Sequence, residues 1–325
     1  MTSLGARLAL AALFLTACGP DGWSPAFDAT SSGWLMNVWG SSEDSVLTVG
    51  GAPDRGRMFR YDGAEWREET LGVEVPLLNW IHGFGPNDVT VVGNAGTILH
   101  FDGAGWSPQG SGTTEDLWGV WGAAPNDLWA VGGSGFVEAT ATILHYDGSA
   151  WTIVELPALT REVHGLFKVW GTSSDNVYVV GQRGTVLHWQ GSAWTEELVG
   201  ASDDLVSIWG TGPDRVVAIG GRGNGIVSRW DGTEWRTEFL TPLPGLNGIW
   251  MRDASTAHVA GTRGTLGVLD VDSLTVTESP VPVTRDFHAC FGVGGRLFAV
   301  GGNLATGIAG PHEGVAYARG LEDGE

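Results

Sequence analysis

Three features of the sequence predict an all-β fold: a seven-bladed β-propeller of four-stranded antiparallel blades, closed by an N-terminal strand that completes the last blade. An aromatic-Gly pair recurs at a mean interval of 42 residues, a period typical of propeller blades. Each repeat divides into four strand-length segments, called strands A to D, which turn residues separate. The last repeat lacks strand D, and one strand-D segment stands alone at the other end of the chain.

Strand A of each repeat has the form LxxVWG, as in 117–122 and 166–171. Its aromatic position recurs at intervals of 43, 39, 49, 39, 41 and 41 residues, which sets the register of all seven repeats. The recurring pairs are Trp39-Gly40, His82-Gly83, Trp121-Gly122, Trp170-Gly171, Trp209-Gly210, Trp250-Met251 and Phe291-Gly292.

The rest of each repeat supplies the other three strands of a blade. A Pro/Ser-Asn-Asp turn leads to strand B, which is rich in β-branched residues, as in 88–93. A glycine turn leads to strand C, as in 97–101, and an Asp-Gly hairpin leads to strand D, because Asp-Gly favours the positive φ of a tight turn. Strand D opens with tryptophan at Trp66, Trp106, Trp151, Trp194 and Trp235.

The two ends of the repeat array set the blade count. The seventh repeat, 287–320, has strands A, B and C but no DGxxW segment, whereas 22–27 resembles a strand D that has no A, B or C before it. Six whole repeats and one split repeat predict seven blades, with no open edge. We expect the propeller to span 23–320 and an acidic tail to span 321–325.

The first eighteen residues predict export. Arg7 precedes an apolar run at 8–17 that is too short to span a bilayer, so 1–17 reads as a signal peptide. The run ends in Leu15-Thr16-Ala17-Cys18, which resembles the bacterial lipobox; the alternative is an ordinary signal peptide followed by a chance cysteine. The resemblance implies lipidation of Cys18, a tether at 18–22 and a lipid anchor in the cell envelope, with the outer membrane favoured because Gly19 follows the cysteine.

The charge of the chain restricts its partners. There are 37 acidic and 17 basic residues, and Lys168 is the only lysine. A net charge of −20 repels nucleic acid and anionic membrane surfaces, so we expect no nucleic-acid partner and membrane contact through the lipid anchor only. Once Cys18 is acylated, Cys290 has no disulfide partner, and we expect a monomer held together by its core.

The phrase VWG…NDVWAVG…GTILHYDGxxW resembles the tryptophan-rich repeats of bacterial β-propeller lipoproteins of myxobacterial type, over nearly all of the chain after Cys18. Its DGxxW corners also resemble the Asp-box hairpins of sialidases and related propellers. Such corners are structural, so the resemblance implies the fold and not an activity. The matching corners begin at Asp62, Asp102, Asp147 and Asp231, whereas Gln190 replaces the aspartate in the fourth repeat.

Histidines and acid pairs are the first candidates for chemistry. His100, His145 and His188 share one position on strand C, where the blade rotation keeps them apart. We therefore expect them to pack between blades, to bond a neighbouring polar group and not to bind a metal. The pairs Glu68-Glu69, Glu196-Glu197 and Asp203-Asp204 show no spacing that selects a general acid and base, and we interpret them as solvated edge and loop residues.

Cys290 and His288 stand two residues apart on one strand. This spacing predicts that both side chains lie on one face, which leaves a thiol–imidazole pair open beside the alternative of a buried, inert thiol. We therefore predict no catalytic residue, no metal and no cofactor.

Loop variation indicates where a partner binds. The A–B and C–D turns are nearly constant, whereas B–C turns and D–A connections vary, with insertions at 52–57, 134–140 and 303–313. These variable segments open on one face of a propeller, and variable loops on a rigid scaffold commonly carry function. On that face three successive B–C turns place arginine identically, and two arginines of the first repeat join them, which predicts an anion- or partner-binding surface. Its residues are Arg183, Arg222, Arg263, Arg55 and Arg57.

These observations favour a non-enzymatic, envelope-anchored scaffold that holds a protein or glycan on the variable face. The alternatives are a sialidase-like, carbohydrate-active propeller and an accessory subunit of an outer-membrane assembly machine. A sialidase needs a nucleophilic tyrosine, and packing in the repeats explains Tyr61, Tyr146 and Tyr178, which leaves Tyr317.

Overall fold

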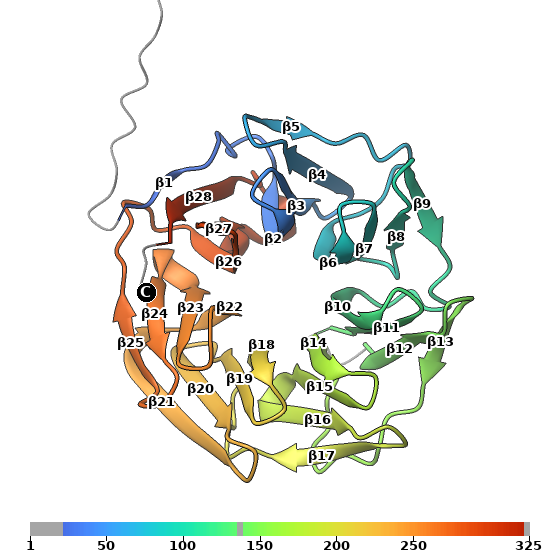
Figure 1. The fold of residues 1–325 in the computed structure, drawn as a ribbon, viewed down its shortest axis with the longest axis vertical. Helices are drawn as coiled ribbons and strands as arrows, with labels where there is room; N and C mark the ends of the chain where they lie inside the picture. Colours follow the sequence, from blue (N-terminus) through green and yellow to red (C-terminus); the bar gives the residue numbers. More distant parts are fainter. Residues whose placement is uncertain (1–21, 135–138, 322–325) are drawn as a thin grey trace, which may run out of the picture.

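The computed structural model describes residues 22–134 and 139–321. Its strands form seven four-stranded sheets arranged around a central axis (Figure 1), which confirms the predicted seven-bladed propeller. Six sheets contain four consecutive strands, and the seventh has the order β1-β28-β27-β26. Cys18, the expected signal peptide, the tether before Gly22 and the last four residues of the acidic tail lie outside the described residues.

Every blade runs outward from the axis in the order A, B, C, D. Blades 1 to 3 are β2 (Trp34–Ser42), β3 (Ser45–Ala52), β4 (Arg55–Tyr61) and β5 (Trp66–Glu68); β6 (Leu78–Gly85), β7 (Asp88–Gly93), β8 (Ile98–Phe101) and β9 (Trp106–Gln109); β10 (Leu117–Ala124), β11 (Asp127–Gly132), β12 (Thr142–Tyr146) and β13 (Trp151–Val154). Blades 4 and 5 are β14 (Leu166–Ser173), β15 (Asn176–Gly181), β16 (Thr185–Trp189) and β17 (Trp194–Leu198); β18 (Leu205–Gly212), β19 (Arg215–Gly220), β20 (Asn224–Trp230) and β21 (Trp235–Pro244). Blades 6 and 7 are β22 (Leu246–Met251), β23 (Thr256–Gly261), β24 (Leu266–Asp270) and β25 (Thr275–Glu278); β26 (Asp286–Val293), β27 (Arg296–Gly302), β28 (Gly314–Gly320) and β1 (Ser24–Pro25).

The two ends of the propeller share blade 7. Strand β1 pairs with β28 in the register Ser24↔Ala318 and Pro25↔Tyr317, and Figure 1 shows these first and last strands side by side. The Trp23 ring is buried beside them, and the Arg319 guanidinium lies 5.5 Å from its centre. The N-terminal strand therefore completes the last blade, as predicted.

The Trp-Gly pairs join successive blades. The tryptophan ring of one blade lies on the glycine of the next, so that a Cβ atom on Gly171 would lie 2.8 Å from Cη2 of Trp121. On Gly292 it would lie 2.3 Å from Cη2 of Trp250. Because atoms do not approach so closely, only glycine leaves room for the ring.

The Asp-Gly corners are structural. Asp147 Oδ1 accepts hydrogen bonds from the backbone N–H groups of Ser149 and Ala150 at 2.8 and 3.0 Å, and Gly148 has a φ of 90°. The tryptophan that follows packs on the aromatic residue before the corner, with ring centres 5.2 Å apart for Tyr146 and Trp151. The same contact recurs at 5.1–5.8 Å for Tyr61–Trp66, Phe101–Trp106, Trp189–Trp194 and Trp230–Trp235.

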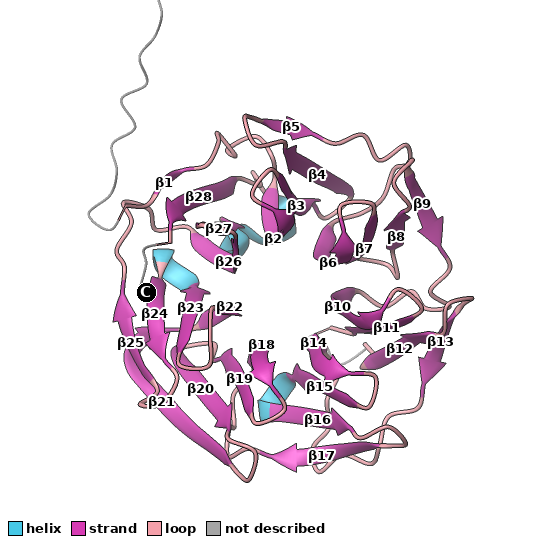
Figure 2. Ribbon diagram, in the orientation of Figure 1, coloured by secondary structure: helices cyan, strands magenta, loops and turns pink. Residues whose placement is uncertain are grey.

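Helical structure is confined to short turns between strands, as Figure 2 shows. The 3-10 turns are η1 (Gln182–Gly184), η2 (Thr262–Gly264) and η3 (Leu304–Ala309). Across the described residues, no helix has the length and apolar character needed to cross a bilayer.

Candidate functional site

The propeller presents two different faces around its axis. The loop face carries the B–C turns and the D–A connections, such as those between β3 and β4 and between β5 and β6. The turn face carries the A–B and C–D turns, such as those between β2 and β3 and between β4 and β5. All five arginines of the predicted binding surface lie on the loop face.

The B–C turns of blades 4 and 6 are held by the blade that follows each of them. Arg183 and Arg263 adopt left-handed φ angles of 56° and 58°. Their backbone N–H groups donate to Asp204 Oδ1 at 3.0 Å and to Asp286 Oδ1 at 2.9 Å. Ala95 occupies the same place in blade 2, with a φ of 52° and a 2.9 Å bond to Asp116. The backbone therefore sets this turn, and the fold does not require the arginine side chain.

The prediction that three arginines are placed identically is wrong for Arg222. In blade 5 Gly221 takes the positive φ of 92°, and the Arg222 backbone N–H donates to Asp203 at 2.8 Å. Its side-chain Nε donates to Asp204 Oδ2 at 2.7 Å, and its guanidinium lies 5.2 Å from the centre of the Phe167 ring on the innermost strand of blade 4. Arg222 thus differs from Arg183 and Arg263 in backbone conformation and in its partners, although the side chains of all three are exposed.

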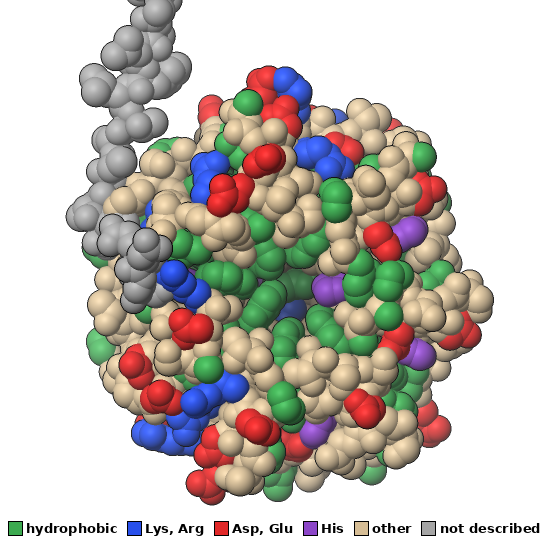
Figure 3. All heavy atoms as spheres, in the orientation of Figure 1, with side chains coloured by type: hydrophobic (Ala, Val, Ile, Leu, Met, Phe, Trp, Pro, Cys, Tyr) green, Lys and Arg blue, Asp and Glu red, His purple; other side chains and the backbone are tan. Residues whose placement is uncertain are grey.

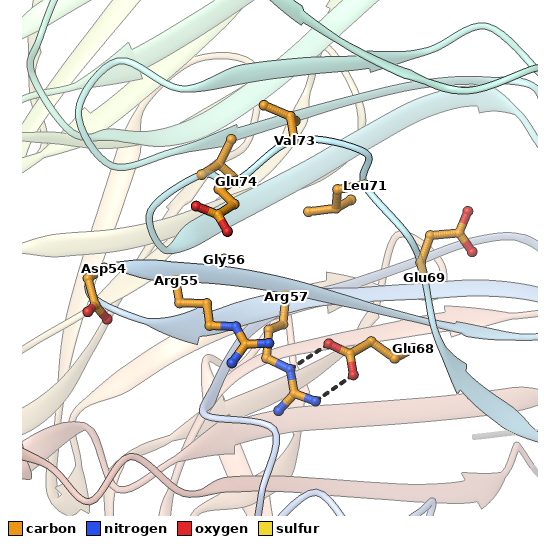
Figure 4. A pocket seen from close by; sticks show the side chains of 10 residues that line it. Asp54, Arg55, Gly56, Arg57, Glu68, Glu69, Leu71, Val73 and Glu74 are labelled. Atoms are coloured by element: carbon orange, nitrogen blue, oxygen red, sulfur yellow. Dashed lines mark hydrogen bonds and ion pairs between the residues drawn. The ribbon is translucent and has the colours of Figure 1, made fainter.

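Arg55 and Arg57 lie on β4 and line a cleft of about 570 Å³ between the B–C turn and the D–A connection of blade 1 (Figure 4). Arg57 forms a bidentate pair with Glu68, with both N···O distances at 2.7 Å. Further carboxylates, from Asp54, Glu69 and Glu74, line the same cleft. The cleft is therefore mixed in charge and is not a simple cationic patch.

A second cleft lies at the corresponding place in blade 2. It has a volume of about 590 Å³ and is lined by Ala95 and Gly96 of the B–C turn and by residues 109–114 of the D–A connection. Two neighbouring blades thus each open a cleft on the loop face.

The axis itself holds a smaller cavity of about 250 Å³, lined by residues of the seven innermost strands. Figure 3 shows hydrophobic side chains around the central hollow, with one Lys or Arg side chain at its floor and a His at its rim. The Lys and the His that line the cavity are Lys168 and His82. Aromatic side chains supply much of the wall: Trp39, Trp80, Trp121, Trp170, Trp209 and Phe291.

Lys168 is buried on β14 at 2% exposure. Its Nζ donates to the backbone carbonyl of Trp118 at 3.0 Å and lies 3.6 Å from the centre of the Trp80 ring. Gly119 of the intervening blade lets β10 and β14 approach closely, because a Cβ atom there would lie 3.0 Å from Lys168 Cα. Burial lowers the pKa of Lys168 to about 7.

This cavity was not predicted from the sequence, because the recurring aromatic position indicates only the architecture of the blades. The available signal was a lone lysine inside an otherwise apolar strand A of a strongly acidic chain.

Cys290 and His288 do not lie on one face, so the prediction from their spacing was wrong. The register of β26 shifts between Phe287 and Ala289, and this irregularity at His288 breaks the alternation of side chains. His288 Nδ1 bonds the carbonyl of Met36 in blade 1 at 2.7 Å, whereas Cys290 Sγ donates to the carbonyl of His258 in blade 6 at 3.3 Å. Burial raises the pKa of the Cys290 thiol to about 12, which suits an inert thiol.

The strand-C histidines pack inside their own blades. His100 and His145 bond Asp88 and Asp127 at the start of strand B, at 3.0 and 2.8 Å. His188 bonds Asn176 and Glu197, both at 2.7 Å. Within the part of the chain that the structure describes, no group of three or more His, Cys, Asp or Glu side chains is arranged to hold a metal ion.

The acid pairs have structural partners, which differs from the expectation of solvated edge and loop residues. Glu197 accepts bonds from His188 and from Trp235 Nε1 of the next blade, and Asp203 and Asp204 hold the arginine turns.

Tyr317 is buried on β28 with its ring 5.9 Å from Phe287. The tyrosine that the sialidase alternative left over is therefore a core residue.

Comparison with known proteins reveals similarity in fold. No protein family model matches the chain, and no curated protein matches its sequence. Among solved structures, YCF48 from Cyanidioschyzon merolae superposes with a TM-score of 0.67 at 16% identity, covering 92% of this chain and 99% of that one. YCF48 bound to D1 peptide gives 0.66 at 17% identity, over 93% and 97% of the two chains. The WD40 β-propeller domain of Doa1 gives 0.66 at 11% identity, over 91% and 97%. The chain is thus a seven-bladed β-propeller with the overall shape of YCF48 and WD40 propellers.

Proposed function

We propose that this protein is a non-enzymatic scaffold, lipid-anchored at Cys18 in the cell envelope, that holds a protein partner on its loop face. The observation that carries the proposal is the pair of clefts in blades 1 and 2, each between a B–C turn and a D–A connection. Because the two clefts lie in neighbouring blades, together they form a polar surface that spans two blades of a rigid framework.

The arginine turns support the same face. The turn conformation depends on a backbone N–H and an aspartate of the next blade, as Ala95 and Asp116 demonstrate without an arginine. The exposed guanidinium groups of Arg183 and Arg263 are thus available to pair with carboxylates of a partner. Arg55 adds an exposed guanidinium at the blade 1 cleft.

The structural comparisons supply a precedent for a protein partner. One of the similar propellers is YCF48 bound to D1 peptide, so a propeller of this shape can hold a peptide. This precedent favours a protein over a glycan.

Affinity capture tests the proposal. The bait is the chain from residue 19, exposed to extracts of the cell envelope of the source bacterium. Two variants, Arg183→Ala/Arg222→Ala/Arg263→Ala and Arg55→Ala/Arg57→Ala, address the two parts of the loop face. The control, Arg67→Ala/Arg236→Ala, removes two exposed strand-D arginines that pair within their own blades.

We expect a reproducible protein partner whose recovery falls at least about tenfold in one or both loop-face variants but not in the control, because charge-assisted hydrogen bonds are lost. Equal recovery with all variants would overturn the loop-face assignment. The same proteins are also applied to a glycan array. If the array gives a signal that depends on the arginines and the affinity capture does not, the partner is a glycan and not a protein.

The anchor has a test of its own. Metabolic labelling with an alkyne fatty acid is expected to tag the full chain and not the Cys18→Ala variant. Separation of inner and outer membranes then locates the tagged protein, and an untagged wild-type chain would remove the lipoprotein part of the proposal.

A further inference from the structure

The axial cavity differs in kind from the loop-face clefts. Tryptophan and other apolar side chains form its wall, and the single lysine of the chain also lines it. Lys168 extends from blade 4, bonds the Trp118 carbonyl of blade 3 and ends over the Trp80 ring of blade 2. Three blades therefore cooperate to hold one amino group on the axis.

The charge environment of Lys168 is unusual for this protein. The chain has 37 acidic residues, yet no carboxylate within the described ranges forms an ion pair with this amine. A buried cation without a counter-ion is unfavourable, and the Trp80 face and one carbonyl only partly offset the loss of water. An ammonium has three N–H donors, and one of them is used in the hydrogen bond to Trp118. The two remaining N–H donors of Lys168 can therefore bond an anion in the cavity.

A second polar atom lies in the same lining. Nε2 of His82 is buried and has no hydrogen-bond partner. Buried polar atoms in proteins are nearly always bonded, so an unpartnered nitrogen in the same lining as Lys168 points to a ligand with polar atoms of its own.

We propose that the axial cavity binds a small monocarboxylate with a flat, apolar body. The carboxylate accepts hydrogen bonds from Nζ of Lys168, and the ring lies among the tryptophans of the wall. The volume of about 250 Å³ is below the roughly 300–1,000 Å³ of sites for drug-sized ligands, which limits the apolar body to one or two rings. This site does not depend on the proposed scaffold function, because it lies on the axis and needs no loop-face residue.

Calorimetric titration of the chain from residue 19 tests the proposal. The probes are phenylacetate and indole-3-acetate, with phenylacetamide as the neutral control. We expect saturable binding of the acids at millimolar or lower concentration, and at least tenfold weaker binding of the amide, because a hydrogen bond between charged groups is lost.

A Lys168→Met variant removes the amine and keeps an apolar stem of similar length, while Arg236→Met is the matched change at an exposed position. We expect Lys168→Met to weaken binding of the acids by roughly 10- to 100-fold, with the amide unaffected, and Arg236→Met to leave both unchanged. Equal binding of acid and amide, or retention of acid binding in Lys168→Met, would overturn the proposal.

The wild-type chain provides a test that does not depend on whether the variant folds. Because there is only one lysine, ¹⁵N-lysine labelling reports one side-chain Nζ, whose signal is expected to shift as the acid saturates the site. No shift and no heat at 10 mM phenylacetate would refute the site. A hexapeptide ending in phenylalanine, with either a free carboxylate or an amide at its terminus, identifies the source. If only the hexapeptide with the free carboxylate competes with the small acid, the natural ligand is the C-terminus of a peptide chain. If neither hexapeptide competes, the natural ligand is a free small acid.

Discussion

Gly210 on β18 lies directly against the indole ring of Trp170, which belongs to the preceding blade. A Cβ atom at Gly210 would lie 2.4 Å from Cη2 of Trp170 and 2.6 Å from the backbone oxygen of Arg215. The same relationship joins Trp39 to Gly83 and Trp121 to Gly171. The recurring tryptophan and glycine are therefore adjacent in the sequence of several blades because, in the structure, the ring of one blade contacts the glycine of the next.

The Gly210→Ala substitution is expected to lower the free energy of unfolding by about 1–3 kcal/mol, because neither the ring nor the backbone oxygen can move away easily. Gly212→Ala on the same strand is the matched control, since no atom lies within 4 Å of a Cβ there. It is expected to change stability by less than about 0.5 kcal/mol. Urea unfolding of both variants measures the difference, and equal stabilities would contradict the assigned contact.

Loss of the closing strand is expected to weaken blade 7 in particular. Trp23→Ala removes a ring that is 3% exposed, and a change of this kind lowers the free energy of unfolding by about 3–5 kcal/mol. Hydrogen exchange should accelerate first in β28, which loses its outer neighbour, and Trp23→Phe should retain most of the protection. If β28 exchanges at the wild-type rate in Trp23→Ala, the closure does not depend on this segment.

The Asp147 corner gives a pH-dependent prediction. The hydroxyl of Ser149, 2.7 Å from Oδ1, and two backbone N–H groups lower the pKa of this carboxyl from 3.8 to about 2. Its contribution to stability is therefore complete above pH 3.8 and is lost as the pH falls toward 2. Ser149→Ala is expected to raise the pKa of Asp147. Asp102, which accepts only backbone N–H groups at its corner, serves as the internal reference in a carboxyl NMR titration. An unchanged pKa in Ser149→Ala would exclude the hydroxyl as the main cause.

Lys168 gives a prediction at neutral pH. Its Nζ signal in ¹⁵N-lysine-labelled protein is expected to titrate near pH 7 and not near 10.5. Because the unfolded chain binds this proton more tightly, the contribution of Lys168 to stability rises with pH between about 7 and 10.5. The difference in unfolding free energy between wild type and Lys168→Met should follow that rise.

Other titratable groups near the axis limit the pH range over which this comparison reports Lys168 alone. His288 has a pKa lowered to about 3, chiefly by burial and then by the charge of Lys168, and His82 has one lowered to about 4 by burial. The pKa of Cys290 is raised to about 12. Both proteins share these groups, so the difference between pH 7 and 9 isolates Lys168. A difference that does not change with pH would mean that the amine keeps an ordinary pKa.

The sequence by itself determined the architecture of this protein. The aromatic-Gly period, the Asp-Gly corners and the split last repeat predicted the blade number, the strand order and the closure, and the structure confirms them. Each of these signals is local, since a corner such as 147–150 forms from neighbouring residues and recurs with variations in blades 1 to 5.

The candidate sites, in contrast, depend on contacts between blades, and the strand order predicted from the sequence does not reveal these contacts. The different backbone conformation of Arg222, the opposite directions of His288 and Cys290, and the structural partner of Glu197 each arise from a turn, a bulge or a neighbouring blade. The cavity around Lys168 needs three blades that the sequence separates by 88 residues from Trp80 to Lys168. Only the closed ring brings these groups together, because the direction of a side chain at the axis is set by the packing of blades and not by the period of the repeat.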